Sequence, residues 1–277
     1  QVYLEGSLLP IAAGVGSIGT NTLPFASGVF NYLKATSLDF EGLANLGFNN
    51  MTVSGVATVN ELVLTKIGHV RYARGFASIQ LAINDLPEEG GMVILSASGY
   101  VESGIITQGT DATVRSNVDL IGQGIGVTEV VGGDGITNNM VTANSVNGSV
   151  MNMSVDGNGS NAGALTDIDC IAVLANSVLI SDVEVKAAKS HGVSWKGSDD
   201  LTLLRIQARN NLSHGIANRM ISAATRASGV AILNCLSEGN GGNGYCLGRY
   251  KAAASAEPPP NLLVNECVAR QNDLHGF

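Results

Sequence analysis

The chain has 277 residues, enough for one or two domains. Charged residues make up only 14% of it and apolar residues 45%, which excludes a disordered chain and leaves ample material for a core. The net charge of −8 argues against a nucleic-acid partner. No apolar stretch approaches the roughly 20 residues that a bilayer span needs, so we expect no membrane insertion.

No cofactor or metal site is expected. The four cysteines, Cys170, Cys235, Cys246 and Cys267, lack CxxC zinc spacing and are interpreted as small core residues. Cys235 and Cys267 share one repeat position, which leaves open either a disulfide or stacked free thiols. The glycine-rich runs 156–161 and 239–244 lack, respectively, the closing acid of a calcium loop and the Lys-Ser/Thr of a phosphate loop.

Residues 1–68 have the pattern of a stalk rather than of a globular domain. They are poor in charge and rich in Gly, Ser, Thr and Asn. Period-2 alternation over residues 56–64 predicts short strands, and such strands cannot enclose a core in a segment of this length. We therefore expect an extended β-rich docking segment that is completed by other chains, and hence an oligomer, with a homotrimer as the favoured form.

Two stretches of this segment resemble the tail fibres and tail spikes of bacterial viruses. Residues 17–30 contain "IGTNTLPFASGVF", similar to an "IGxxxxPFxxxxF" segment of those proteins, and residues 51–59 resemble their "VSGxAxV" stem repeats. The resemblance implies that residues 1–68 dock onto other tail or baseplate proteins. It also implies a location in the virion, outside the host cell, and a bacterial surface polysaccharide as partner.

The second part, residues 69–277, begins with a helix and a strand. The spacing of Phe76, Ile79, Ala82, Ile83 and Leu86 predicts one apolar helical face, ended by Pro87. A strand over 92–95 follows the glycines at 90 and 91, and "SGYVE" and "VDLIGQG" come next. This order resembles the entry cap of pectate-lyase-like right-handed β-helices, in which a short helix covers the first apolar layer.

The fold prediction rests on a sequence repeat. Four segments start at Val178, Leu201, Val230 and Leu262 and match at five offsets, despite unequal separations of 23, 29 and 32 residues. Thirteen residues after each start lie His191, His214, Asn243 and His275, each followed by glycine. Repeats of this length without helical periodicity predict an all-β solenoid, a right-handed parallel β-helix. We expect it to continue beyond residue 277.

Three residues form the candidate polysaccharide-binding site. After the histidine-glycine pairs, alternation places Lys196 and Arg219 at one outward position of neighbouring coils, where an anionic ligand would neutralise both. Trp195 is expected to point inward, as core or as a sugar-stacking platform. The histidine column itself is interpreted as structural, since Asn243 fills the same position.

The sequence identifies no catalytic residues. Glycosidases use paired carboxylates, and the candidates are Asp167 with Asp169, Asp199 with Asp200, and Glu184 near Arg205. The column Asp182, Arg205, Asn234 and Glu266 is interpreted as an outward structural ladder. Three functions stay open: a virion tail spike that engages polysaccharide, with or without depolymerising it; a secreted polysaccharide lyase, hydrolase or epimerase; and a structural filament or adhesin. Fold alone does not choose among them, or between lyase and hydrolase chemistry.

Overall fold

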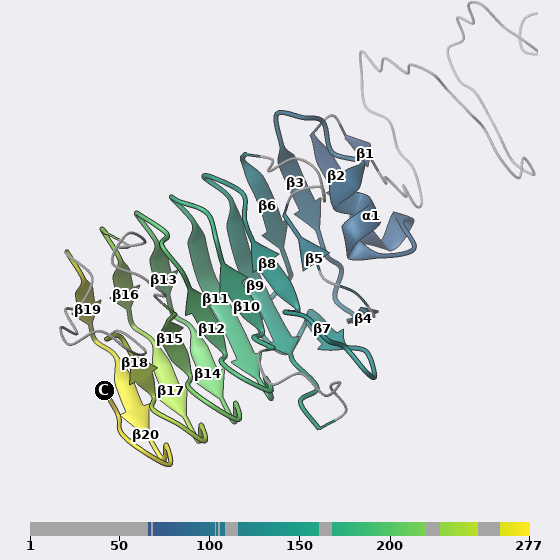
Figure 1. Ribbon diagram of the computed structural model, residues 1–277. Helices are drawn as coiled ribbons and strands as arrows, with labels where there is room; N and C mark the ends of the chain where they lie inside the picture. The colour runs from purple at the N-terminus through teal and green to yellow at the C-terminus, as the bar shows by residue number, and fades with distance from the viewer. Residues whose placement is uncertain are drawn as a thin grey trace, which may run out of the picture. The chain divides into compact units, whose positions relative to one another are not determined.

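The computed structural model describes residues 66–67, 69–102, 104, 106–108, 116–160, 168–219, 228–248 and 261–277. Their fold is a stack of coils that form a parallel β-helix, as the repeat predicts (Figure 1). Within these residues all strand pairs are parallel except the entry pair of β1 and β2. The predicted stalk over residues 1–68 lies outside the described residues, apart from Lys66 and Ile67.

Each coil contributes strands to three faces. The first face contains, in pairing order, β1 (Lys66–Ile67), β2 (Val70–Tyr72), β3 (Gly91–Ile94), β6 (Val118–Ile121), β9 (Ser149–Asp156), β11 (Leu179–Lys186), β13 (Thr202–Leu204), β16 (Ala231–Leu233) and β19 (Leu263–Asn265). The second contains β4 (Gly99–Glu102), β7 (Glu129–Gly132), the later halves of β9 and β11, β14 (Gln207–Arg209), β17 (Leu236–Glu238) and β20 (Val268–Arg270). The third contains β5 (Ile106–Thr107), β8 (Val141–Ala143), β10 (Ile171–Val173), β12 (Val193–Trp195), β15 (Ile216–Asn218) and β18 (Tyr245–Cys246).

The predicted repeat register is confirmed. Ile180 pairs with Leu203, Leu203 with Ile232, and Ile232 with Val264. The first three side chains of this column are fully buried, and each such aliphatic burial contributes about 1.5–3 kcal/mol before conformational entropy is subtracted. Equivalent inward columns on the other two faces complete one continuous core.

Corners between the strands are made by residues in the left-handed backbone region. They recur every five residues, as at Ser177, Asp182 and Ala187, and stack from coil to coil. The predicted outward column occupies the second of the three left-handed corner positions in each coil. Its members are Asp182 (φ 56°), Arg205 (φ 53°), Asn234 (φ 54°) and Glu266 (φ 51°). Arg205 donates to Asp182 through Nε and Nη2, at 2.5 and 2.6 Å, and this contact lowers the pKa of the Asp182 carboxyl. The structural interpretation of this column is therefore confirmed.

Side-chain amides satisfy backbone groups inside the stack. The Asn240 amide oxygen accepts from the backbone N–H of Asn211 at 3.1 Å, and its Nδ2 donates to the carbonyl of Ala208 at 3.2 Å. Asn272 repeats the arrangement one coil further on, where its Oδ1 accepts from the backbone N–H of Asn240. These buried amides compensate backbone groups at a bend, where strand pairing is interrupted.

The entry helix α1 (Ile79–Asn84) is shorter than predicted. Ser78 is extended and its hydroxyl accepts from the Leu81 N–H, so the helix begins after it, and Phe76 lies outside. A 3-10 turn, η1 (Ala73–Gly75), precedes it. Ile79, Ala82 and Ile83 are buried against the first coils, as the apolar face predicts.

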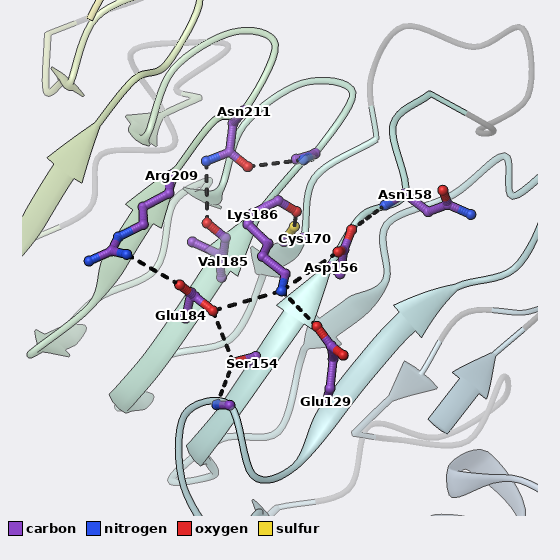
Figure 2. Close-up of polar contacts among 12 residues, drawn as sticks. Glu129, Ser154, Asp156, Asn158, Cys170, Glu184, Val185, Lys186, Arg209 and Asn211 are labelled. Atoms are coloured by element: carbon purple, nitrogen blue, oxygen red, sulfur yellow. Dashed lines mark hydrogen bonds and ion pairs between the residues drawn. The ribbon is translucent and has the colours of Figure 1, made fainter. Parts of the chain in front are cut away.

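Acidic and basic side chains form a network of ion pairs on the second face. Figure 2 shows Lys186 between Glu129, Asp156 and Glu184, with N–O distances of 2.6, 3.8 and 4.0 Å. The row continues through Arg209, 3.8 Å from Glu184. The neighbouring carboxylates, Glu129 above all, hold the pKa of Lys186 above its ordinary value. Glu184 pairs with Lys186 and Arg209, whereas Arg205 pairs with Asp182, so the structure shows no ion pair between Glu184 and Arg205 among the described residues.

The cysteine prediction is half right. Cys170 and Cys235 are buried, and burial raises the pKa of the Cys235 thiol to about 12. Cys246 and Cys267 are half-buried, and all four are free thiols. No helix among the described residues is long and apolar enough to cross a membrane.

Candidate functional site

The third face carries a cleft of about 660 Å³. Its floor consists of small side chains that occupy one outward register position: Ala172, Ser194, Ala217 and Cys246. One side of it is formed by Asn139, Asp169, His191 and His214, and Trp195, Lys196, Asn218 and Arg219 also line it. The cleft therefore contains all three predicted site residues.

The first four residues of a hydrogen-bonded row, here called the turn ladder, form one wall of the cleft. The ladder consists of Asn139, Asp169, His191, His214, Asn243 and His275. Each of the first five side chains accepts a bond from the backbone N–H of the next member, at 3.0, 2.9, 3.3, 2.8 and 3.3 Å in chain order. The structural interpretation of the histidines agrees with this row. Sequence reasoning missed that Asn139 and Asp169 belong to it.

Close approach of the coils explains the glycine that follows the last four ladder residues, His191, His214, Asn243 and His275. A Cβ placed on Gly192 would lie 2.6 Å from the carbonyl oxygen of Gly215, and one on Gly215 would lie 2.0 Å from the Ser237 hydroxyl. The rings of His191 and His214 stack with centroids 5.1 Å apart. The histidine-glycine pair therefore serves the turn as a unit.

The ladder also determines the histidine tautomers. Because Nδ1 of His191 and of His214 accepts a backbone N–H, each neutral ring carries its proton on Nε2. Such a ring can donate from Nε2 but cannot take up a proton there. Burial lowers the pKa of His214, which keeps the neutral form dominant at neutral pH.

Asp169 anchors the other components of the site. It is fully buried; its Oδ2 accepts from the Ser194 hydroxyl at 2.5 Å and from Arg219 Nη1 at 2.9 Å. The carboxylate thus holds Arg219 against the floor and neutralises it. The prediction that Arg219 awaits an external anion is corrected by this pair, which bridges residues 50 positions apart.

Lys196 and Trp195 differ sharply in exposure. Lys196 is exposed and has no ion pair among the described residues, so its charge is available to a ligand. Trp195 is completely buried and belongs to the core cluster, as alternation predicts. Because neither ring face is open to solvent, Trp195 does not form a stacking platform.

The predicted carboxylate pairs do not form a catalytic site among the described residues. Asp199 accepts from the backbone N–H of Ser228 at 2.7 Å, and Asp200 is a left-handed corner residue, so both belong to turns. Asp167 lies outside the described residues. Asp169 is the sole carboxylate among the described residues of the cleft. Its two oxygens already accept hydrogen bonds from His191, Ser194 and Arg219.

Comparisons with known proteins reveal fold likeness only. No family model and no curated protein matches the sequence. Among solved structures, the catalytic domain of a GH87 α-1,3-glucanase in complex with nigerose has a TM-score of 0.57 at 13% identity, covering 79% of this chain and 37% of the other. ORF18 of Geobacillus virus E2 has a TM-score of 0.53 at 15% identity, covering 74% and 50%. The mannuronan C-5 epimerase AlgE6 A-module of Azotobacter vinelandii has a TM-score of 0.49 at 21% identity, covering 70% and 62%. The chain thus spans less than two thirds of each.

Replacing His191 by Asn should leave stability within about 0.5 kcal/mol of wild type, because Asn243 already fills this ladder position. His191→Ala removes the acceptor of the His214 N–H and should cost about 1–2 kcal/mol. Urea unfolding of the three proteins measures both. An equal loss in the two variants would show that the ring, and not the acceptor, matters.

Acid should weaken the fold through His214. Its folded pKa lies below the unfolded value of about 6.5, so its contribution is complete above that pH and is lost as pH falls from there toward the folded pKa. The His214→Asn variant keeps an acceptor but does not titrate. Thermal unfolding between pH 7.5 and 5 should therefore show a smaller loss in the variant. Identical pH profiles would contradict this assignment.

Proposed function

We propose that the chain is the receptor-binding part of a bacterial-virus tail spike or fibre, and that its cleft engages a bacterial surface polysaccharide. In this proposal residues 1–68 dock onto other tail or baseplate proteins, and the β-helix is presented outside the cell. The observation that supports this proposal most directly is the cleft, which has a wall of polar ladder side chains, a floor of small side chains and the exposed Lys196. The likeness to a viral protein and to a glucanase with bound sugar is consistent with both parts.

The dimensions of the cleft suit a chain rather than one sugar. Its residues come from successive coils, those of β8, β10, β12, β15 and β18. At a spacing of about 4.8 Å between coils, the cleft extends roughly 20 Å along the stack. A polysaccharide laid along it would meet a similar row of donors and acceptors at every coil.

The charges favour an acidic polysaccharide. Arg219 is neutralised by Asp169, whereas Lys196 has no carboxylate partner among the described residues. A carboxylate or other anion on the sugar would pair with Lys196 at the edge of the cleft. Such a pair, partly shielded from water, contributes more than a fully exposed one.

The described residues favour binding over hydrolysis. Hydrolysis uses two carboxyl groups, and Asp169 alone is found among the described cleft residues. Both cleft histidines, His191 and His214, carry their proton on Nε2, the ring nitrogen that is not used by the ladder, so neither can take up a proton there. Lyase or epimerase chemistry, the second candidate, would need Lys196 as the base, because Arg219 is ion-paired.

Lys196→Ala should weaken retention of acidic capsular polysaccharides about three- to tenfold, since one cation is lost from the cleft. Affinity electrophoresis with a panel of acidic and neutral bacterial polysaccharides measures this. Arg74→Ala, which removes an exposed cation at the entry cap, is the matched control and should bind normally. Unchanged binding by Lys196→Ala would place the site elsewhere, and retention by no polysaccharide would contradict the proposed function.

The oligomeric state separates the spike from a secreted enzyme. Docking segments without a core of their own predict three chains per particle. Light scattering on the 277-residue chain gives the absolute mass directly. A single chain at micromolar concentration would contradict the spike assignment and favour the secreted enzyme.

A further inference from the structure

Three outward side chains form a column, here called the edge column, at the ends of neighbouring strands of the third face. Leu174, Lys196 and Arg219 directly follow β10, β12 and β15, which pair side by side (Figure 1). The Lys196 N–H donates to the Val173 carbonyl at 3.2 Å. The Arg219 N–H donates to the Trp195 carbonyl at 2.8 Å, so strand pairing continues through the column. Because Val173 and Trp195 are completely buried, the residues that follow them point outward, into the cleft that they line.

The edge column presents three different chemical groups in a fixed order along the stack. Leu174 offers an apolar side chain that is 52% exposed. Lys196, one coil further from the entry helix, offers a cation without an ion pair among the described residues. Arg219 follows after one more coil and is neutralised by Asp169. With about 4.8 Å between coils, the apolar group and the available cation are direct neighbours at one edge of the cleft.

Leu174 differs in position from the other exposed apolar residues. Single apolar side chains are common on protein surfaces and need no partner. Of the ten large apolar side chains that are exposed among the described residues, however, Leu174 alone lines the cleft. Ala172, two residues earlier on the same outward side of β10, extends its apolar surface onto the floor. A polysaccharide laid along the cleft therefore covers an apolar surface immediately before it meets the cation of Lys196.

The group that fits this apolar surface is a methyl. A hydroxyl placed against Leu174 and Ala172 gives up hydrogen bonds to water and finds no donor or acceptor on these two side chains. A methyl removes apolar surface from water on both partners, which is worth about fourfold in affinity for each methyl that is buried. In a polysaccharide, methyl groups occur on O-acetyl esters and on 6-deoxy sugars.

We propose that the edge column selects acidic polysaccharides that carry a methyl-bearing substituent about 5 Å from the acidic group, with the methyl on Leu174 and the acid on Lys196. This rests on the proposed function and narrows its substrate class. Leu174 is then a specificity-determining residue, because Lys196 by itself accepts any acidic chain. Since the order of the column is fixed, the polysaccharide lies in one direction, with the methyl nearer to the entry helix.

Substitutions at Leu174 test this on the 277-residue chain. The probe is the acidic polysaccharide that wild type retains most strongly in affinity electrophoresis. Leu174→Asn places a polar side chain of similar size at this exposed position and should weaken retention about fourfold, which corresponds to about 0.8 kcal/mol. Leu174→Met keeps an apolar side chain and should bind like wild type. Leu81→Asn, the same change at an exposed leucine of α1 outside the cleft, is the matched control and should not alter retention.

Removal of the methyl from the probe distinguishes its two sources. Mild alkali hydrolyses O-acetyl esters to acetate and free hydroxyls but leaves 6-deoxy sugars intact. If the methyl is that of an acetyl group, wild type loses about fourfold on the treated probe, and Leu174→Asn loses nothing further on it. If the methyl belongs to a 6-deoxy sugar, the difference between wild type and Leu174→Asn persists after alkali and disappears on a probe that lacks 6-deoxy sugars.

Two results would overturn the proposal while leaving the proposed function intact. One is equal retention by wild type and Leu174→Asn of a probe whose retention Lys196→Ala weakens. The other is an equal loss by Leu174→Asn on polysaccharides that carry no methyl substituent, which would show that a sugar ring and not a methyl covers the leucine. Failure of wild type to retain any polysaccharide contradicts the proposed function instead.

Discussion

The strand and corner backbone donors of a stacked coil find their acceptors mainly one coil away, and this constraint shapes the described fold. Along the strands, parallel pairing meets it. At the turns, where pairing is interrupted, side chains meet it: the asparagines 211, 240 and 272 inside the stack, and the turn ladder beside the cleft. Because four of the ladder side chains, Asn139, Asp169, His191 and His214, also line the cleft, residues that hold the coils together determine the chemistry of the candidate site. That explains why the cleft histidines have a fixed tautomer.

The two charged faces show how the chain separates stability from binding. On the second face, carboxylates and cations are interspersed, and each of the cations Lys186, Arg209 and Arg270 lies within 4.0 Å of at least one acid (Figure 2). Each exposed pair contributes little alone, and the like-charged register partners Lys186 and Arg209 both lie within 4.0 Å of Glu184, which offsets their repulsion. In the cleft, Arg219 is held by Asp169 and Lys196 remains available. An anionic ligand is therefore expected at the third face and not at the second.

The sequence predicted the periodic part of this structure and missed the long-range part. The apolar column Ile180, Leu203 and Ile232 was found because inward positions keep one spacing within each coil, whatever the length of the loops between them. Membership of Asp169 in the ladder was missed because an aspartate does not resemble a histidine, although both offer an acceptor to the next N–H. The Asp169–Arg219 ion pair joins two coils that are separated by one other coil, and no local sequence pattern indicates it. Alternation placed Trp195 inward, but only the packed structure reveals its unpaired N–H.

The central claim is that a polysaccharide binds along the cleft of the third face. A crystal structure of the 277-residue chain with a bound oligosaccharide from a retained polysaccharide tests it most directly. We predict sugar rings lying along the stack beside the turn ladder, with an acidic group at Lys196. Sugar bound on the first or second face, with the cleft unoccupied, would contradict the account.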